Sequence, residues 1–234
     1  MTRLAAFAIA AACLALAGCD ALPGRPHPAA PTAPAALFDR AYGRNCAGCH
    51  GADGKLGAAR SLNDPVYLAI LGEERLRAIV ADGVAGTSMP AFTVSAGGPL
   101  TDAQIDALAT GMIARWGKPD AVKGLALPPY RADAATGSAD RGGAVYAAAC
   151  ARCHGPGGAG GPSAGSIVDA SFLALVSDQS LRTTVIAGRP DLGKPDWRED
   201  VPGQPLTPEQ IADVVAWLAS NRRPVPGRPA LGGG

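Results

Sequence analysis

Apolar residues recur at helical spacing along most of the chain, and almost no stretch alternates in the manner of a β-strand. The clearest stripes, one near the end of each half, are Ile105, Leu108 and Met112 and then Ile211, Val214, Val215 and Leu218. Residues three and four apart lie on one face of an α-helix, so each stripe predicts a helix with one face to bury. The pattern predicts an all-α protein.

Capping signals precede both stripes. Thr101 and Thr207 are each followed three positions later by a glutamine, and Pro208 occupies the first helical position of the second copy. This spacing is typical of a capping box, so we expect helices to begin at both threonines. Apolar spacing predicts further helices over 37–45, 66–71, 73–81, 141–149, 170–177 and 179–187.

The second half of the chain repeats the first at an offset of 104 to 106 residues. The matched segments, in order, are Cys46 with Cys150, 64–71 with 169–176, and 99–101 with 205–207. Ordered matches of this kind predict two domains of one type. We place the domains at residues 36–117 and 138–223, with a proline-containing linker at 118–137 and a flexible tail at 224–234.

The N-terminus predicts export. Arg3 precedes an apolar run that ends in Leu16-Ala17-Gly18-Cys19, which resembles the bacterial lipobox. We therefore interpret residues 1–19 as a lipoprotein signal peptide with Cys19 as the acylated residue, and the Pro/Ala-rich residues 20–35 as a tether. An ordinary secretory peptide with an incidental cysteine is the alternative. The expected location is the periplasmic side of the bacterial inner membrane, with the lipid as anchor.

Composition excludes several other classes. Once Arg3 is removed with the leader, the mature chain has equal numbers of basic and acidic side chains, so no basic surplus favours nucleic acid. No second apolar segment approaches the roughly 20 residues of a membrane helix. Aromatic residues make up only 5% of the chain, so a bound apolar group would help to fill the core.

Two copies of Cys-x-x-Cys-His carry the candidate chemistry. Thiols three positions apart can each form a thioether with a haem vinyl group, and the next histidine then becomes the proximal iron ligand. The candidate attachment residues are Cys46, Cys49 and His50 in the first copy and Cys150, Cys153 and His154 in the second. A redox-active thiol pair, a zinc site and a disulfide are the alternatives. Export, the histidine and the duplication favour two covalently bound haem c groups, each with one iron.

The residues around these motifs resemble the class I cytochrome c family, and the tandem arrangement resembles the dihaem cytochromes c. The resemblance implies that Tyr42 and Tyr146 pack the N-terminal helix of each domain on its C-terminal helix, with Trp116 and Trp217 as candidate partners. It also implies that the turn at Gly161-Pro162 supplies the carbonyl that accepts the ring N–H of His154. The first copy has Gly57-Ala58 at that turn.

The resemblance further implies a methionine on the loop before the last helix as the sixth iron ligand. Met89, followed by proline, fits this position, whereas Met112 lies on the core stripe. The equivalent position of the second half is Lys194, again followed by proline. A lysine amine binds iron only when it is deprotonated. Lys194 is therefore a candidate ligand, and a five-coordinate second haem is the alternative; His27 lies in the tether, where a solvated role is expected.

Together these features predict a dihaem cytochrome that passes single electrons between redox partner proteins, such as respiratory or photosynthetic oxidoreductases. It would act as a carrier or as a subunit of a complex, and no catalytic residue is assigned. Two alternatives use the second haem. One is an oxidoreductase resembling the thiosulfate dehydrogenases, whose active haem depends on a cysteine ligand that this chain lacks. The other is a ligand-binding haem protein.

Overall fold

The computed structural model describes residues 33–131, 137–201 and 203–223. Cys19, His27, the signal peptide at 1–19, most of the tether and the tail at 224–234 lie outside these residues. Within them, the regular elements are α-helices and short 3-10 helices, and the bridges Thr93–Leu100 and Arg189–Lys194 are the extent of β-pairing. The all-α prediction is confirmed.

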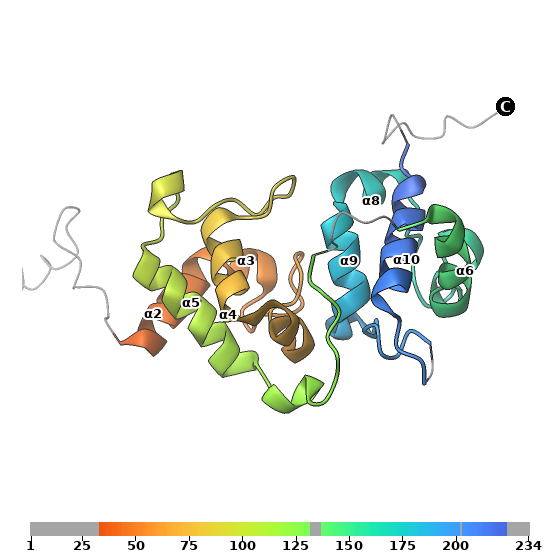
Figure 1. Ribbon diagram of the computed structural model, residues 1–234. Coiled ribbons are helices and arrows are strands. Elements are labelled where there is room, and N and C mark those ends of the chain that lie inside the picture. Colours follow the sequence, from red (N-terminus) through yellow and green to blue (C-terminus); the bar gives the residue numbers. More distant parts are fainter. Residues whose placement is uncertain (1–32, 132–136, 202, 224–234) are drawn as a thin grey trace, which may run out of the picture.

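The first domain is a group of packed helices that lies beside the second domain (Figure 1). In chain order its elements are α2 (Pro34–Asn45), α3 (Ala47–His50), α4 (Pro65–Asp82), η2 (Val94–Ala96) and α5 (Asp102–Trp116). Helix α5 packs against both α2 and α4. The sequence predicts two helices where α4 lies, and the structure joins them across a kink at Gly72, whose φ of 68° is left-handed.

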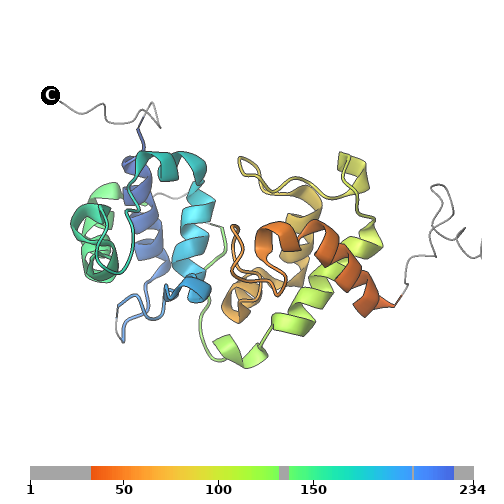
Figure 2. The same ribbon diagram turned by 180° about the vertical axis from the view of Figure 1, so that it is seen from behind.

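The second domain repeats this arrangement (Figures 1 and 2). Its elements are α6 (Ala139–Ala149), α7 (Ala151–His154), η4 (Pro156–Gly158), α8 (Ala170–Leu175), α9 (Asp178–Ala187), η5 (Pro190–Leu192) and α10 (Pro208–Ser220). Helix α10 packs against α6 and α9. Val176 has an extended backbone and separates α8 from α9, near the position where the non-helical Gly72 kinks α4 in the first domain.

Both predicted capping boxes are present. The side chain of Thr101 accepts from the backbone N–H of Gln104, whose own side chain accepts from the N–H of Thr101. Thr207 and Gln210 make the same pair of bonds at the start of α10. Each box satisfies two backbone donors that a helix start leaves without partners, which explains why α5 and α10 begin there.

The predicted tyrosine contacts are also present. Tyr42 meets Trp116 edge to face, with ring centroids 5.2 Å apart, and Tyr146 stacks on Trp217 at 4.2 Å. The two tryptophans are not equivalent positions of the repeat, because Trp116 ends α5 whereas Trp217 lies within α10. An aromatic pair therefore packs the first helix of each domain on its last helix, and the geometry of the pair differs between the domains.

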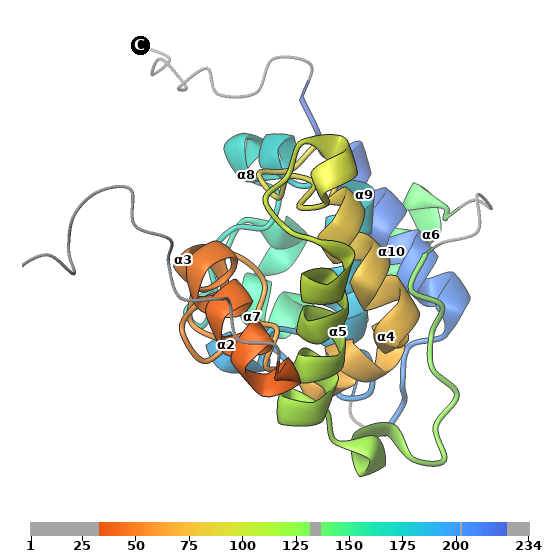
Figure 3. The ribbon, with the colours of Figure 1, turned by 90° about the vertical axis from the view of Figure 1, so that its left-hand side faces the viewer.

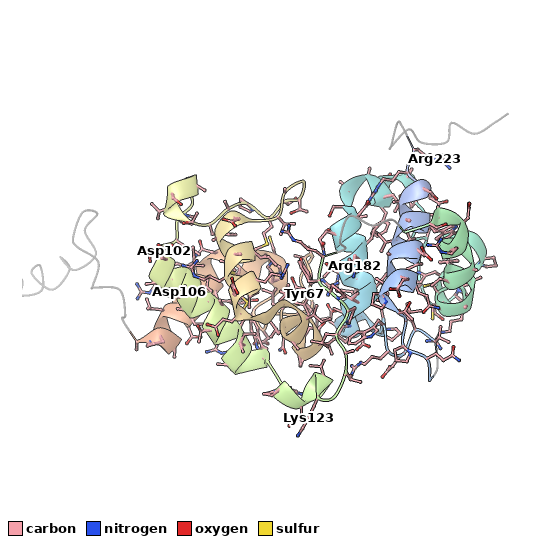
Figure 4. All side chains as sticks on the ribbon, viewed as in Figure 1. Tyr67, Asp102, Asp106, Lys123, Arg182 and Arg223 are labelled. Carbon is pink, nitrogen blue, oxygen red and sulfur yellow. The ribbon has the colours of Figure 1, made fainter. Side chains whose placement is uncertain are left out.

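The linker between the domains passes beside helix α9 (Figure 1), and in Figure 3 helices α4 and α5 of the first domain lie in front of α9 and α10 of the second. It begins with η3 (Pro119–Val122), and its later backbone oxygens bond to α9. Arg182 donates to the carbonyls of Pro129 and Tyr130, and Gln179 donates to the carbonyl of Tyr130. Figure 4 shows Arg182 on α9 and Tyr67 on α4 on either side of this boundary. The described part of the linker is thus bonded to the second domain.

Candidate functional site: two haem attachment motifs

Each Cys-x-x-Cys-His motif forms a helical turn directly after the first helix of its domain. Cys46 ends α2, its N–H bonding to the carbonyl of Tyr42, and the N–H of His50 bonds to the carbonyl of Cys46 at 2.9 Å. In the second copy the N–H of His154 bonds to the carbonyl of Cys150 at 3.0 Å. This turn places the two thiols one turn apart, with the histidine next to the second thiol.

A tyrosine ties each motif to its helix. The Tyr42 hydroxyl donates to the carbonyl of Gly51 at 2.8 Å, and the Tyr146 hydroxyl donates to the carbonyl of Gly155 at 2.5 Å. Both glycines directly follow the histidine. Gly51 has a φ of 83°, and a Cβ there would lie 2.0 Å from the backbone oxygen of Lys55, so only glycine fits. The tyrosine therefore holds in place the glycine that directly follows the histidine.

Both histidine rings are oriented by a backbone carbonyl. Nδ1–H of His50 donates to the carbonyl of Arg60 at 2.7 Å, and Nδ1–H of His154 donates to that of Gly165 at 3.1 Å. The prediction that Gly161-Pro162 supplies the acceptor is wrong. The chain reverses over 161–164, where the Gly161 N–H bonds to the carbonyl of Ala164, and the next carbonyl meets the ring. The corresponding acceptor of the first copy is likewise beyond Gly57-Ala58.

This orientation suits an iron ligand. With Nδ1 occupied by a hydrogen bond, Nε2 is the nitrogen left to coordinate, and such a bond raises the basicity of the ring. Burial lowers the pKa of His50, and this is opposed in part by the hydrogen bond to Arg60. A lowered pKa favours the neutral imidazole that a metal requires.

The first thiol of each motif has the character of a structural cysteine rather than a reactive one. Burial raises the pKa of Cys46 to about 11, helped by the neighbouring Cys49, and burial raises the pKa of Cys150 to about 11. Thiols that remain protonated at neutral pH are poor thiolate ligands and poor redox nucleophiles. All four motif cysteines are free of disulfides. In the described part of the chain, no group of three or more His, Cys, Asp and Glu side chains is placed to hold a metal ion.

The residues present therefore fit haem c. Each domain offers two unpaired thiols one helical turn apart for thioethers and one histidine whose Nε2 is available. The roles of Cys46, Cys49, His50, Cys150, Cys153 and His154 follow from this fit and stay predictions at the level of single residues.

The loops that carry Met89 and Lys194 are closed by an equivalent backbone hydrogen bond. The N–H of Val84 bonds to the carbonyl of Met89 at 3.0 Å, and the N–H of Arg189 bonds to that of Lys194, also at 3.0 Å. A left-handed glycine opens each loop, and a Cβ on it would approach the backbone oxygen of the candidate ligand, Met89 or Lys194, within 2.7 Å. Lys194 therefore occupies in the second domain the place that Met89 occupies in the first.

The side chain of Lys194 has two oxygen partners. Its Nζ donates to the carbonyl of Pro195 at 3.0 Å and lies 3.6 Å from a carboxylate oxygen of Asp200, which is buried. Burial raises the pKa of Asp200, and Lys194 lowers it in part. Both charges also act on the Cys150 thiol, which places this pair beside the second motif. For Lys194 to bind iron, its amine would have to leave Asp200 and lose a proton.

Met112 is buried on the core face of α5, as its stripe position predicts. Two residues at these sites, Asp200 and Arg60, belong to no motif recognised in the sequence. Asp200 follows no motif, and Arg60 lies between the first motif and α4 with no distinctive neighbours. A comparison of charge between the two halves at equal register is the one signal that could have singled them out.

The fold and the two motif sites define a protein of two tandem c-type cytochrome domains, which binds two haem c groups and transfers electrons. The chain belongs to the family described as cytochrome c oxidase, cbb3-type, subunit III, whose model matches residues 29–110 and again 137–218. The double match agrees with the repeat found in the sequence. The exact limits of the domains stay predictions.

Similarity to other known proteins is more distant. A search of curated proteins gives no match. Among solved structures, the chain is similar to one from the Kuenenia stuttgartiensis reducing HAO-like protein complex Kustc0457/Kustc0458, with a TM-score of 0.48 and 14% sequence identity. That similarity covers 80% of this chain and 96% of the other.

Proposed function

We propose that this protein is a lipid-anchored dihaem cytochrome that passes single electrons between redox partner proteins on the periplasmic side of a bacterial inner membrane. The observation that carries the proposal is the duplicated motif site. Two thiols and a histidine oriented by a carbonyl recur in one chain at matched register. So does the loop that carries Met89 or Lys194, which we call the axial loop. Two redox centres in one chain suit transfer between a donor and an acceptor.

Each residue of the site has a defined task. The cysteines of a motif would hold the haem covalently, and His50 or His154 would bind the iron from one side. The carbonyls of Arg60 and Gly165 keep the proximal ring in one tautomer. Haem c supplies a reversible one-electron iron couple when it is bound. Met89 would complete the first iron's coordination, and a Met/His pair raises the potential of a haem.

The membrane part of the proposal depends on Cys19. The structure describes no helix long and apolar enough to cross a bilayer within residues 33–131, 137–201 and 203–223. A diacylated N-terminal cysteine would hold the protein through lipid instead, since two acyl chains give stable anchoring. Partners would be oxidoreductases of a respiratory or photosynthetic chain in the same membrane.

A second candidate function follows from the Lys194–Asp200 pair. An ammonium group held by a buried carboxylate is not a free donor, so a second haem beside it would have an open axial position. An open position binds small ligands. The oxidoreductase alternative gains no comparable support, because the described cysteines are the four of the haem motifs.

The main test compares haem content with electron transfer. A pyridine haemochrome assay should give two haems per chain for the wild type and one for either Cys46→Ala/Cys49→Ala or Cys150→Ala/Cys153→Ala. A chain with two haems that is reduced and reoxidised by membrane fractions supports the carrier. Loss of membrane association in Cys19→Ala, with haem content unchanged, supports the lipid anchor. Failure of membranes to exchange electrons with the dihaem protein would contradict the proposal.

A further inference from the structure

Arg60 of the first domain touches both a haem ligand and the second domain. Its backbone carbonyl accepts the Nδ1–H of His50 at 2.7 Å. Its guanidinium crosses the domain boundary, where Nη1 donates to the carbonyl of Gly188 at 3.2 Å and Nη2 donates to Oγ1 of Thr184, also at 3.2 Å. One residue therefore joins the proximal face of the first haem site to α9.

Several contacts hold this side chain in place. The guanidinium lies over the ring of Tyr67, 4.9 Å from its centroid, in the geometry of a cation–π contact. Thr184 uses its own proton on the carbonyl of Ser180, so its oxygen is left to accept from Arg60. The two terminal nitrogens of arginine's rigid guanidinium reach two separate acceptors at once. Lysine has only one nitrogen and cannot reproduce this geometry.

The acceptor Gly188 belongs to the loop that carries Lys194. It ends α9 with a left-handed φ of 65°, and a Cβ on it would lie 2.6 Å from the backbone oxygen of Lys194. The next residue, Arg189, exchanges two backbone hydrogen bonds of 3.0 Å with Lys194. A contiguous set of bonds thus runs from the ring of His50 to the axial loop of the second domain.

From this geometry we infer that Arg60 is a positioning residue, through which the second domain fixes the carbonyl that orients His50 and so sets the potential of the first haem. The inference rests on His50 being the proximal ligand of that haem. A shorter, well-aligned bond to Nδ1–H makes the imidazole a stronger donor and stabilises ferric iron. When the side chain loses its partners in the second domain, the carbonyl is held less firmly and the first haem becomes easier to reduce.

The same contacts predict that the potential of the first haem changes even when no charge is added or removed. Arg60→Ala also removes a cation, and that loss alone would favour ferric iron and lower the potential. Thr184→Val removes one acceptor of the guanidinium and leaves every charge in place, and Arg60→Lys keeps the charge but loses the double donation. These two variants therefore separate positioning from electrostatics.

The test uses the full dihaem protein and measures both haem potentials by spectroelectrochemical titration. We expect the first haem's potential to rise in Thr184→Val and in Arg60→Lys, by more than that of the second. Exchange of the His50 Nδ1–H with solvent, followed by NMR, should be several-fold faster in both variants. Thr183→Val is the matched control, since this hydroxyl bonds only to Gln179 of the same helix among the contacts described.

Two results would overturn the inference. One is a first-haem potential and exchange rate in Thr184→Val and Arg60→Lys that equal those of Thr183→Val. The other is an equal shift of both haems, which would indicate a general loss of domain packing. Haem content distinguishes either result from failure of the proposed function, because each variant must still give two haems per chain by pyridine haemochrome.

Discussion

Phe38 of α2 lies against Gly111 of α5, and the second domain reverses the sizes of this pair. At matched register Phe38 becomes Gly142 and Gly111 becomes Trp217. A Cβ at Gly111 would lie 2.3 Å from Cδ2 of Phe38, and one at Gly142 would lie 2.0 Å from the backbone oxygen of Asp213. The same helix crossing is thus packed by a large residue on the first helix in one domain and on the last helix in the other.

This reversal predicts different responses to one substitution. Gly111→Ala overpacks the buried Phe38 ring, which should destabilise the first domain by about 1–3 kcal/mol. The higher helix propensity of alanine offsets up to about 1 kcal/mol of this loss. Replacing Phe38 by leucine in the same chain should recover part of the loss, because the clash is with a side chain. Denaturant unfolding of the single and double variants measures this coupling.

Gly142→Ala brings a Cβ within 2.0 Å of the backbone oxygen of Asp213 and 2.6 Å of the Cβ of Trp217, and a shorter side chain at 217 removes neither atom. We therefore expect a larger loss of stability than for Gly111→Ala and no recovery when Trp217 is shortened to leucine. Gly43→Ala is the control, since nothing lies within 4 Å of the place that a Cβ would take there, and the gain in helix propensity should stabilise by up to about 1 kcal/mol. Recovery of Gly142→Ala by Trp217→Leu would show that the helices approach less closely than described.

The axial loop of the second domain predicts an ordering of potentials. If the amine of Lys194 binds iron, it stabilises the ferric state more than a thioether does, so the second haem has the lower potential. Lys194→Met should raise that potential toward the first, and Met89→Lys should lower the first. Spectroelectrochemical titration checks both changes, and a low-temperature electron paramagnetic resonance spectrum reports the ligands. A high-spin ferric signal from one wild-type haem would exclude lysine ligation and favour the ligand-binding function.

The tyrosine that ties each motif to its helix should contribute measurably to stability. Tyr42→Phe removes a part-buried hydrogen bond to Gly51 and Tyr146→Phe a buried one to Gly155, each at a cost of about 1 kcal/mol. Burial raises the pKa of Tyr42 to about 12, so its hydroxyl stays a donor far into the alkaline range. Thermal unfolding at neutral pH measures the loss, and unchanged midpoints in both variants would contradict the assigned bonds.

Acid stability should depend on Asp213. Its carboxylate accepts three bonds of 2.7 Å, two from the guanidinium of Arg141 and one from the N–H of Ser138. The bonds from Arg141, and then that from Ser138, lower the pKa of Asp213 in the folded state. The stability that this carboxylate contributes is therefore fully present above its unfolded pKa of about 3.9 and is lost as the pH falls through the lower, folded value.

Thermal unfolding of Asp213→Asn tests this sign. The variant should be less stable than the wild type at pH 6, and the difference should shrink as the pH falls below about 4. Asp106→Asn, on the exposed face of α5 (Figure 4), is the control and should show a much smaller difference. A difference between wild type and Asp213→Asn that grows on acidification would contradict the assignment.

The sequence predicted most of the helices because their signals are local. The capping boxes at Thr101 and Thr207, the stripes and the repeat register need only neighbouring residues, and the structure confirms them. The carbonyl acceptor of His154 was misplaced because a turn of unknown geometry separates it from the motif. Gly165 meets His154 only after the chain reverses at 161–164, and no spacing rule shows that reversal.

The contacts between the domains could not be predicted from the sequence for a different reason. Arg60 and Thr184 lie more than a hundred residues apart and in different copies of the repeat, so comparing the copies at equal register cannot pair them. The ion pair of Lys194 with Asp200 was missed because a carboxylate six residues along a loop has no fixed position relative to the amine. Their placement depends on tertiary packing, which propensity does not encode.

The linker that bonds to α9 has a consequence for the speed of internal electron transfer. A flexible linker of this length would let the second domain diffuse relative to the first, and electron transfer between the haems would depend on how often they approach each other. Because η3 packs against α4 of the first domain, while Arg182 and Gln179 hold Pro129 and Tyr130 on α9, the linker is fixed to both domains and keeps them side by side. Two haems held by these domains would then exchange electrons across a constant separation, and diffusion would limit only the exchange with partners.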